Sequence, residues 1–139
     1  MTELELCRKA LEAKERAYAP YSGFCVGAAL LTGTGKVYTG CNVENAAFSP
    51  TICAERTALV KAVSEGERAF VMLAVAGGKG ETLAPATPPC GVCRQVLAEF
   101  CAPDFPILLV QSETEYARCT LSDLLPRAFG PGFVCEESL

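Results

Sequence analysis

A continuous run of apolar residues near the middle of the chain constrains the fold more than any other feature. Residues 70–76 read Phe-Val-Met-Leu-Ala-Val-Ala, with no polar residue among them. A strand that does not alternate between apolar and polar residues is typically buried on both faces of its sheet. Helices are predicted on either side of it along the chain, at residues 53–65, which Gly66 closes, and at residues 90–101. This alternation predicts an α/β fold, in which helices cover both faces of a mixed sheet.

The segments around this central unit supply the rest of the sheet. Thr2 and Glu5 fit a capping box at the start of an amphipathic helix over residues 2–18, and Pro20 then stops this helix. The order of elements is α-β-β-α-β-α-β-β-α, which predicts a three-layer α-β-α sandwich around a mixed sheet of roughly five strands. The other predicted elements are a hairpin of strands at 26–32 and 37–41, an irregular segment at 42–52, a loop at 77–89, strands at 107–110 and 118–121, and a short helix from Ser122.

The length and the charge of the chain limit its class and its partners. With 139 residues the chain has the size of one domain, which we place at residues 1–139. No run of about 18 apolar residues is present, and the first residues lack the basic and apolar regions of a secretory signal. Twelve Lys and Arg against sixteen Asp and Glu give a net charge of −4. We therefore expect a protein that binds neither a membrane nor the phosphates of a nucleic acid.

The chain contains no histidine, and this absence removes several kinds of active site. A Ser–His–Asp triad, a Cys–His dyad, a zinc site with histidine ligands and an iron site with two histidines are all excluded. Proton transfer must therefore use Glu, Asp, Lys, Tyr or Cys side chains. A metal ion would have to be held by thiolates or carboxylates.

The chain contains nine cysteines, which are possible metal ligands in a sequence without histidine. Because their number is odd and no export signal is visible, we expect reduced thiols in the cytoplasm rather than a disulfide framework. Three of them, Cys53, Cys90 and Cys93, lie at the beginnings of the two predicted helices. The helix dipole lowers the pKa of a thiol at such a position, so these three favour the thiolate form. The other six are expected to be packing or surface thiols.

The cysteines at the helix starts predict a metal site. Both helices adjoin the strand at residues 70–76, so their N-termini can meet at one edge of the sheet and bring Cys53, Cys90 and Cys93 together. Three protein ligands with an open fourth position are typical of catalytic zinc, whereas a structural zinc site is closed by four. Glu55 stands two residues after Cys53, where a carboxylate can take a proton from a zinc-bound water and deliver it elsewhere. Zinc with three cysteine ligands and a glutamate that is not a ligand is an arrangement of the zinc deaminases.

Two arginines can balance the charge of such a site. Three thiolates around Zn²⁺ leave a formal charge of about −1, which makes the metal a weaker acidifier of water. Arg56 directly follows Glu55, and Arg94 directly follows Cys93. An arginine that donates to ligand sulfurs withdraws charge from them. We expect this role for Arg56 first and for Arg94 second.

The motifs around these residues resemble those of the cytidine deaminase family, in its small, homotetrameric form. The resemblance extends from the first predicted helix to about Phe129. It implies a cytidine deaminase-like fold, a zinc ion in each chain, and hydrolytic deamination of cytidine and 2′-deoxycytidine, a reaction of pyrimidine salvage. The motifs are Cys-Ala-Glu-Arg-Thr-Ala at 53–58, Pro-Cys-Gly-Val-Cys-Arg-Gln at 89–95, Asn-Val-Glu-Asn-Ala at 42–46, Ala-Pro-Tyr-Ser at 19–22 and Phe-Cys-Val-Gly-Ala-Ala-Leu at 24–30.

The resemblance also implies roles for individual residues. The three cysteines at the helix starts would be the zinc ligands, and Glu55 would move protons between water and substrate. The backbone of Ala54 would meet the pyrimidine, and Phe24 would pack on the nucleoside. Asn42 and Glu44 would hydrogen-bond the 3′-hydroxyl of the sugar, so these contacts do not predict a preference between cytidine and 2′-deoxycytidine.

A homotetramer is implied in the same way, with active sites at the interfaces between subunits. In the family a C-terminal phenylalanine of a neighbouring subunit covers the base. Phe129 is the candidate here, and Phe133 lies close to it in the sequence. Phe48 stands where relatives often carry tyrosine, so a polar contact between subunits is in doubt at that position.

Two other classes of function fit parts of the pattern. A Cys-x-x-Cys motif alone also fits a thiol-redox pair, and a fourth cysteine, Cys41 or Cys101, would turn the site into a structural zinc of a binding domain. Among deaminases, blasticidin S, a deoxycytidylate nucleotide and tRNA adenosine are alternative substrates. Relatives that act on nucleotides or tRNA generally carry histidine where Cys53 stands. A carboxylate at Glu44 would also repel a phosphate, which favours a free nucleoside.

Overall fold

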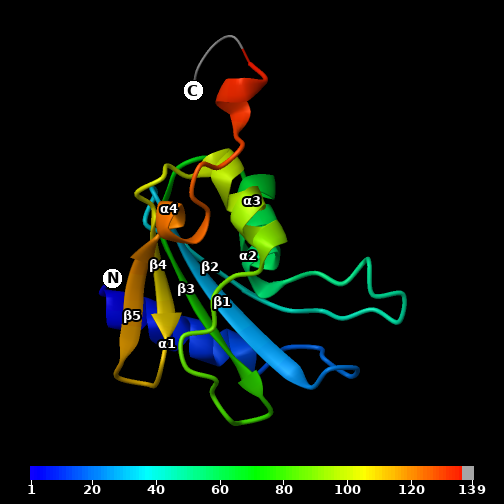
Figure 1. Cartoon of the computed structure of the whole chain (residues 1–139). Helices are drawn as coiled ribbons and strands as arrows, with labels where there is room; N and C mark the ends of the chain where they lie inside the picture. The colour runs from blue at the N-terminus through cyan, green and yellow to red at the C-terminus, as the bar shows by residue number, and fades with distance from the viewer. Residues whose placement is uncertain (136–139) are drawn as a thin grey trace.

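Strands and helices alternate along the chain in the predicted order (Figure 1). The computed structural model describes residues 1–135, so the last part of the predicted domain, residues 136–139, lies outside the described residues. None of the helices in the described part is long and apolar enough to cross a bilayer. The elements are α1 (Glu3–Lys14), β1 (Phe24–Thr32), β2 (Val37–Cys41), α2 (Ala54–Ser64), β3 (Phe70–Lys79), α3 (Gly91–Phe100), β4 (Pro106–Val110), β5 (Tyr116–Thr120), α4 (Leu121–Leu124) and a 3₁₀ turn, η1 (Pro131–Phe133).

The strands form one mixed sheet between two layers of helices. Its strand order is β2-β1-β3-β4-β5, with β3 in the middle. β3 and β4 run parallel, and the other neighbouring strands run antiparallel. One apolar cluster joins α1 to one face of the sheet, and a second joins α2, α3 and α4 to the other face. Figure 1 shows α1 on the opposite side of the sheet from α2 and α3. The predicted three-layer α/β fold with a mixed, five-stranded sheet is confirmed.

The central strand β3 is buried on both faces over residues 73–78, as its apolar sequence predicts, whereas Val71 near its start is exposed. Leu73 and Val75 belong to the cluster beneath α2 and α3, whereas Ala74 and Ala76 belong to the cluster beneath α1. All four residues are fully buried. The larger side chains thus fill the space under two helices, and the alanines face the single helix α1.

The first helix is shorter than predicted. α1 ends at Lys14 and not at residue 18, because the chain after it turns to join a distant segment. The backbone N–H of Tyr18 donates to Asn42 O at 2.9 Å, and Tyr18 O accepts from the N–H of Glu44 at 2.8 Å. Tyr18 fits the helical period of apolar residues, yet its side chain is 56% exposed. Its place is set by these backbone hydrogen bonds between distant segments.

The central strand is longer than predicted and includes the start of the expected loop at 77–89. Gly77 and Gly78 pair with Val26 and Cys25 of β1. Glycine is needed here because the following chain folds back over the strand: a Cβ on Gly78 would lie 1.9 Å from Thr82 O. The other predicted boundaries differ from the observed ones by one or two residues, the usual uncertainty of element ends.

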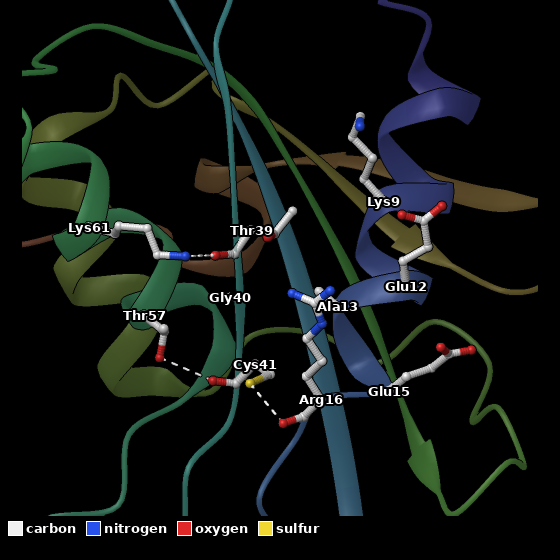
Figure 2. Close-up of a pocket in the computed structure, with 10 residues that line it drawn as sticks. All are labelled: Lys9, Glu12, Ala13, Glu15, Arg16, Thr39, Gly40, Cys41, Thr57 and Lys61. Atoms are coloured by element: carbon white, nitrogen blue, oxygen red, sulfur yellow. Dashed lines mark hydrogen bonds between the residues drawn. The ribbon is translucent and has the colours of Figure 1, made fainter.

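Side chains of α2 protect the outer edge of the sheet at β2. Lys61 Nζ donates to Thr39 O at 2.6 Å, and Thr57 Oγ1 donates to Cys41 O at 3.1 Å (Figure 2). These bonds occupy carbonyl groups that an edge strand otherwise offers to another strand. A cavity of about 380 Å³ lies between this edge and α1, and its lining includes none of the three cysteines at the helix starts. On the α1 side it is lined by residues of the helix and by the two residues that follow Lys14, namely Lys9, Glu12, Ala13, Glu15 and Arg16.

The helix α2 packs so close to β2 that position 40 has room only for glycine. A Cβ on Gly40 would lie 2.5 Å from Ala54 O and 2.6 Å from Ala58 N. Both are backbone atoms, which cannot move aside without moving the helix. The contact therefore sets the position of the first turn of α2, which includes Glu55 and follows Cys53.

We expect Gly40→Ala to destabilise the fold by about 1–3 kcal/mol, the usual range for overpacking a well-packed site. The helix α2 must shift to make room for the added methyl group. Urea unfolding followed by circular dichroism measures the change. Gly130→Ala is the matched control, because a Cβ at Gly130 meets no atom within 4 Å. Equal unfolding midpoints for wild type and Gly40→Ala would contradict the close contact.

Candidate metal centre

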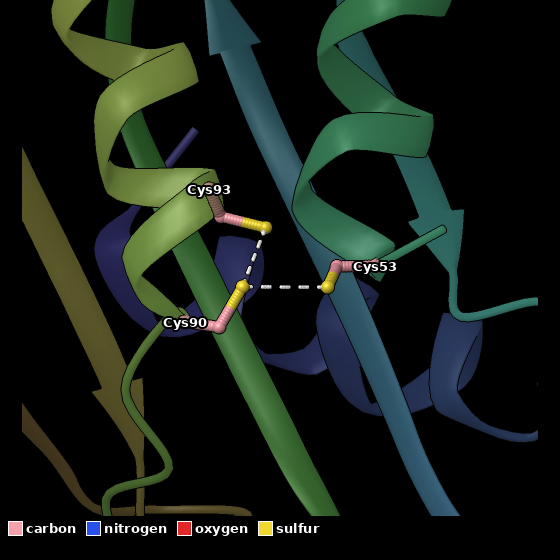
Figure 3. A group of neighbouring side chains, drawn as sticks. All are labelled: Cys53, Cys90 and Cys93. Atoms are coloured by element: carbon pink, nitrogen blue, oxygen red, sulfur yellow. Dashed lines mark hydrogen bonds between the residues drawn. The ribbon is translucent and has the colours of Figure 1, made fainter. Parts of the chain in front are cut away.

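Three cysteine sulfurs meet between the N-terminal ends of α2 and α3, over the face of the sheet that these helices cover (Figure 3). Cys53 is the N-cap residue of α2 and Cys90 the N-cap residue of α3, and Cys93 follows in the first turn of α3. The Sγ of Cys90 lies 3.5 Å from that of Cys53 and 3.5 Å from that of Cys93. All three sulfurs lie within 4.8 Å of one another.

The two N-cap cysteines, Cys53 and Cys90, do not use their sulfurs to cap their helices. At both N-caps the backbone is extended and the thiol makes no capping hydrogen bond. Their backbone carbonyl groups accept the first hydrogen bonds of the helices instead. Cys53 O accepts from Thr57 N, and Cys90 O accepts from Arg94 N, both at 3.0 Å. Pro89, fully buried, directly precedes α3's N-cap. The thiols of both N-caps are therefore free to face a common point.

The geometry and the donor set fit a zinc ion with an open position. Thiolates at Zn–S distances of about 2.3 Å lie about 3.8 Å apart around a tetrahedral ion, close to the spacing observed here. Within residues 1–135 no further Cys, Asp or Glu ligand atom joins the group. The thiol of Cys41 donates to Arg16 O, and burial raises the pKa of Cys101 to about 12. The closed structural site that either of them would complete is therefore not formed.

The sulfur cluster carries negative charge of its own. The nearby Cys93 thiol, followed by the hydrogen bond from Arg56, lowers the pKa of Cys53 to about 5 against the effect of burial. The same proximity, together with burial, raises the pKa of Cys93. Cys53 is thus a thiolate at neutral pH, at a helix N-terminus that favours this form. A divalent cation that displaces the remaining thiol protons meets a site already negative.

The two arginines lie in different environments. Arg56 Nη2 donates to Cys53 Sγ at 3.3 Å, and its Nε is buried with no hydrogen-bond partner in the described part of the chain. Arg94 donates from Nε to Pro89 O and from Nη1 to Leu124 O, both at 2.7 Å. The structure therefore places Arg56 on a sulfur. It places Arg94 on the backbone carbonyls of the loop before α3 and of α4.

Glu55 lies in the first turn of α2 and is almost completely buried, with 4% of its surface exposed. Burial raises the pKa of its carboxyl group to about 7, and the charge of Cys53 acts in the same direction. A group with a pKa near neutrality both gains and loses a proton readily, as a general acid–base catalyst must. Ala54, between Cys53 and Glu55, is fully buried.

The segment that carries Asn42 and Glu44 is joined directly to the metal centre. Val43 N donates to Ile52 O and Ile52 N donates to Val43 O, both at 3.0 Å. Ile52 immediately precedes Cys53 in the chain. The segment after β2 is therefore held next to the first cysteine of the cluster by two backbone hydrogen bonds.

The amide of Asn42 is buried and bound to the start of β1. Its Oδ1 accepts from Val26 N at 2.8 Å, and its Nδ2 donates to Phe24 O at 2.8 Å. Because Val26 N–H can only donate, these bonds define which atom of the amide is the oxygen. The side chain of Phe24, the first residue of β1, is half-buried at this place.

Glu44 accepts three hydrogen bonds from the turn before β1. Its Oε1 accepts from Tyr21 N at 2.9 Å and from Ser22 N at 3.1 Å, and its Oε2 accepts from Ser22 Oγ at 2.5 Å. These bonds, that from the Ser22 hydroxyl first, lower the pKa of the Glu44 carboxyl. The sequence reasoning missed Ser22: it belongs to the Ala-Pro-Tyr-Ser motif at 19–22, but nothing in the motif shows which side chain the hydroxyl meets.

Phe129 and Phe133 form an exposed aromatic pair beside α3. Their rings stack with centroids 5.4 Å apart and planes 14° from parallel. Phe129 is 60% exposed and Phe133 is 76% exposed. Gln95 Nε2 of α3 donates to Phe129 O at 2.8 Å and holds this segment against the helix.

Comparison with known proteins agrees with this geometry. Residues 1–109 match the family model of the cytidine and deoxycytidylate deaminase zinc-binding region. The cytidine deaminase of Sporosarcina psychrophila is 50% identical over 125 residues, which cover 90% of this chain and 89% of that protein. The cytidine deaminase of Halalkalibacterium halodurans is 50% identical over 124 residues, which cover 89% of this chain and 91% of that protein.

Solved structures show the same relationship. The crystal structure of cytidine deaminase from Burkholderia pseudomallei superposes with a TM-score of 0.84 at 46% identity, covering 93% of this chain and 100% of that chain. The similarity thus includes the fold and extends over about nine-tenths of the chain. The part that matches the family model, residues 1–109, contains the three clustered cysteines. The chain belongs to the cytidine and deoxycytidylate deaminase family.

Proposed function

We propose that this protein is a zinc-dependent cytidine deaminase, which converts cytidine and 2′-deoxycytidine with water to uridine and 2′-deoxyuridine and releases ammonia. The observation that carries this proposal is the cluster of three sulfurs without a fourth ligand atom in residues 1–135, next to the buried Glu55. Cys53, Cys90 and Cys93 would hold the zinc ion. When bound, zinc acts as a Lewis acid that lowers the pKa of a water molecule to near neutrality.

Glu55 is the proposed carrier of protons in this reaction. Addition of water at C4 of the pyrimidine needs a base for the proton of water and an acid for the ring nitrogen N3. The amino group needs a further proton before it leaves as ammonia. With no histidine in the chain and a pKa of about 7 for its buried carboxyl group, Glu55 can serve as base and acid in turn. Its burial also keeps bulk water from competing for these protons.

The hydrogen-bonding capacity that Asn42 and Glu44 leave unused includes a donor and an acceptor for one hydroxyl group. Asn42 Nδ2 has two protons, of which Phe24 O takes one. The two oxygens of Glu44 have about four acceptor positions, three of which are filled. One donor on Asn42 Nδ2 and one acceptor position on Glu44 Oε2 therefore remain, the pair that a sugar hydroxyl requires, and Asn42 Oδ1 keeps a further acceptor position beside its bond from Val26 N. This count supports the proposed contact with the 3′-hydroxyl of the nucleoside.

The same pair of residues favours nucleosides over nucleotides. A carboxylate beside the sugar repels a phosphate group, and the net charge of the chain, −4, acts in the same direction. Phe24, at the start of β1, would pack on the nucleoside, and the backbone of Ala54 would meet the pyrimidine. Cytidine monophosphate should therefore be a much poorer substrate than cytidine.

We also propose a homotetramer with active sites at its interfaces. The exposed Phe129 and Phe133 support this proposal, because two stacked and largely exposed aromatic rings are costly to leave in water. A second exposed aromatic pair, Tyr21 and Phe48, lies at the turn beside the sugar-binding residues, with ring centroids 5.9 Å apart. In the proposed assembly Phe129 of one subunit covers the base bound by its neighbour.

Nine free thiols in residues 1–135 favour the reducing cytoplasm, where the reaction would serve pyrimidine salvage.

Glu55→Gln should keep the shape of the side chain but lose the ability to carry a proton. We expect kcat for cytidine to fall by at least about 10²-fold, the size typical of a general acid–base group, with unchanged zinc content and circular dichroism. Loss of cytidine absorbance and release of ammonia measure the rate. Glu12→Gln, an exposed change on α1, is the control. Wild-type turnover by Glu55→Gln would contradict the role of Glu55, and no turnover of cytidine by the wild type would contradict the proposed function.

Arg56→Ala should weaken the hold on zinc, because the thiolate of Cys53 loses its charged hydrogen-bond donor. We expect about 10-fold faster loss of zinc to a chelator or a comparable loss of turnover, as is typical of groups that contact metal ligands. Zinc release is followed with a colorimetric chelator, and turnover is measured on the same samples. If both quantities stay at their wild-type values, Arg56 does not support the ligand.

Mixing two defective variants tests whether Phe129 acts on a neighbouring subunit. Phe129→Ala should lower kcat/KM for cytidine, whereas Phe133→Ala should change it less. When Phe129→Ala and Glu55→Gln proteins are denatured and refolded together, some sites combine an intact Glu55 with an intact Phe129 from another subunit, so activity should exceed the sum of the two variants refolded alone. Sedimentation equilibrium reports the oligomeric state. Strictly additive activity would show that Phe129 does not act between subunits.

A further inference from the structure

The hydroxyl of Ser22 connects two residues of the proposed nucleoside site. Ser22 Oγ donates to Glu44 Oε2 at 2.5 Å and accepts from the backbone N–H of Phe24 at 2.9 Å. A hydroxyl has a single proton to donate, and here it is committed to Glu44. Ser22 therefore acts on the site through Glu44 and the start of β1, and not by donating to a substrate.

The turn that carries Ser22 is held in place without its hydroxyl. Gly23 N donates to Ala19 O at 3.0 Å, and Gly23 adopts a φ of +70°, which glycine accommodates freely. At the start of the turn, the backbone of Tyr18 bonds to both Asn42 and Glu44. The hydroxyl is thus presented to Glu44 by an organised backbone, and its removal should leave the turn intact.

Ser22 determines which acceptor position of Glu44 stays open. Oε1 has two donors, Tyr21 N and Ser22 N, and has no position left. Oε2 has one donor, Ser22 Oγ, and keeps one position. Without the hydroxyl, Oε2 would have no donor in the turn, and the carboxylate could rotate about its last bond. The N–H of Phe24 would lose its partner as well.

We propose that Ser22 is a positioning residue that sets the preference of the enzyme for a nucleoside with a 3′-hydroxyl. It holds Glu44 so that the open position on Oε2 faces that hydroxyl. This inference rests on the proposed function, and it adds a residue that acts through Glu44. A site built around a hydrogen bond to a substrate hydroxyl discriminates strongly against an analogue that lacks it, and loosening the acceptor reduces that discrimination.

The test compares Ser22→Ala with the wild type on cytidine and on 3′-deoxycytidine. We expect kcat/KM for cytidine to fall by about 10-fold, the size of a lost hydrogen bond to a charged group, with most of the change in KM. The value for 3′-deoxycytidine should fall much less, because that analogue has no hydroxyl for Glu44 to accept. The preference for cytidine over the analogue therefore shrinks.

Matched variants separate positioning from stability. Ser22→Thr retains a hydroxyl at this exposed position and should keep the wild-type preference, whereas Ser22→Val has the same size as threonine and should lose it. Ser112 is the control, because its hydroxyl accepts from Thr114 N and Glu115 N in the turn between β4 and β5, toward the other edge of the sheet. Ser112→Ala should leave both substrates unaffected. Zinc content and thermal unfolding are measured for every variant, and the Thr and Val pair decides the question if Ser22→Ala does not fold.

An equal loss on both substrates would overturn the proposal, because it would mean that Ser22 only stabilises its turn. Unchanged kinetics in Ser22→Ala, or equal behaviour of Ser22→Thr and Ser22→Val, would overturn it as well. A wild-type protein that does not deaminate cytidine would contradict the proposed function instead. The two failures are thus distinguished by the wild-type measurement alone.

Discussion

The metal centre depends on two helices whose N-termini lie side by side over one face of the sheet. The helix α3 connects the parallel strands β3 and β4, so it runs back across the sheet and begins at the carboxyl end of β3. A short connection joins the last residue of α2 to the first residue of β3, so α2 also runs antiparallel to β3. Its first turn therefore lies toward the carboxyl end of β3 as well. Cys53 and Cys90, 37 residues apart in the chain, are therefore brought within 3.5 Å. Both sulfurs also lie where a helix N-terminus stabilises negative charge.

Close packing behind the site keeps this meeting point in place. Gly40 lets the backbone of α2 approach β2, and Lys61 and Thr57 of the same helix bind carbonyl groups of the strand. On the other side, Arg94 of α3 holds the carbonyl groups of Pro89 and Leu124. The charge of the sulfurs is met by Arg56 and the helix dipoles, without any histidine. Burial raises the pKa of the Glu55 carboxyl group to about 7.

The proposed sugar-binding side of the site is built from three short segments that lie far apart in the sequence. Tyr18 pairs with the segment after β2, and Val43 in that segment pairs with Ile52 just before α2. These bridges place Asn42 and Glu44 beside the start of β1 and next to Cys53, the first of the proposed zinc ligands. Asn42 uses half of its hydrogen-bonding capacity on this framework, and Glu44 uses three of about four acceptor positions. Among what they leave free are a donor on Asn42 and an acceptor position on Glu44, which supports the proposed recognition of one hydroxyl.

The amino-acid sequence by itself determined the element types and the chemistry of the candidate site. The apolar run at 70–76 indicated a strand covered on both faces. The absence of histidine left thiolates or carboxylates for metal binding, and it left Glu, Asp, Lys, Tyr or Cys for proton transfer. Predictions from local sequence patterns were wrong where contacts between distant segments determine the structure. Tyr18 lies outside α1 because its backbone pairs with Asn42. Gly77 belongs to β3 because it pairs with β1.

Only the tertiary structure decided which polar atoms meet. It placed Arg56 on a sulfur and Arg94 on backbone carbonyls, although both arginines directly follow a residue of the predicted site. It also gave the hydroxyl of Ser22 a partner that no motif spacing indicates. The physical reason is that hydrophobic periodicity and helix capping act over a few neighbouring residues. Hydrogen bonds between side chains instead depend on the relative placement of whole strands and helices, to within a few tenths of an ångström.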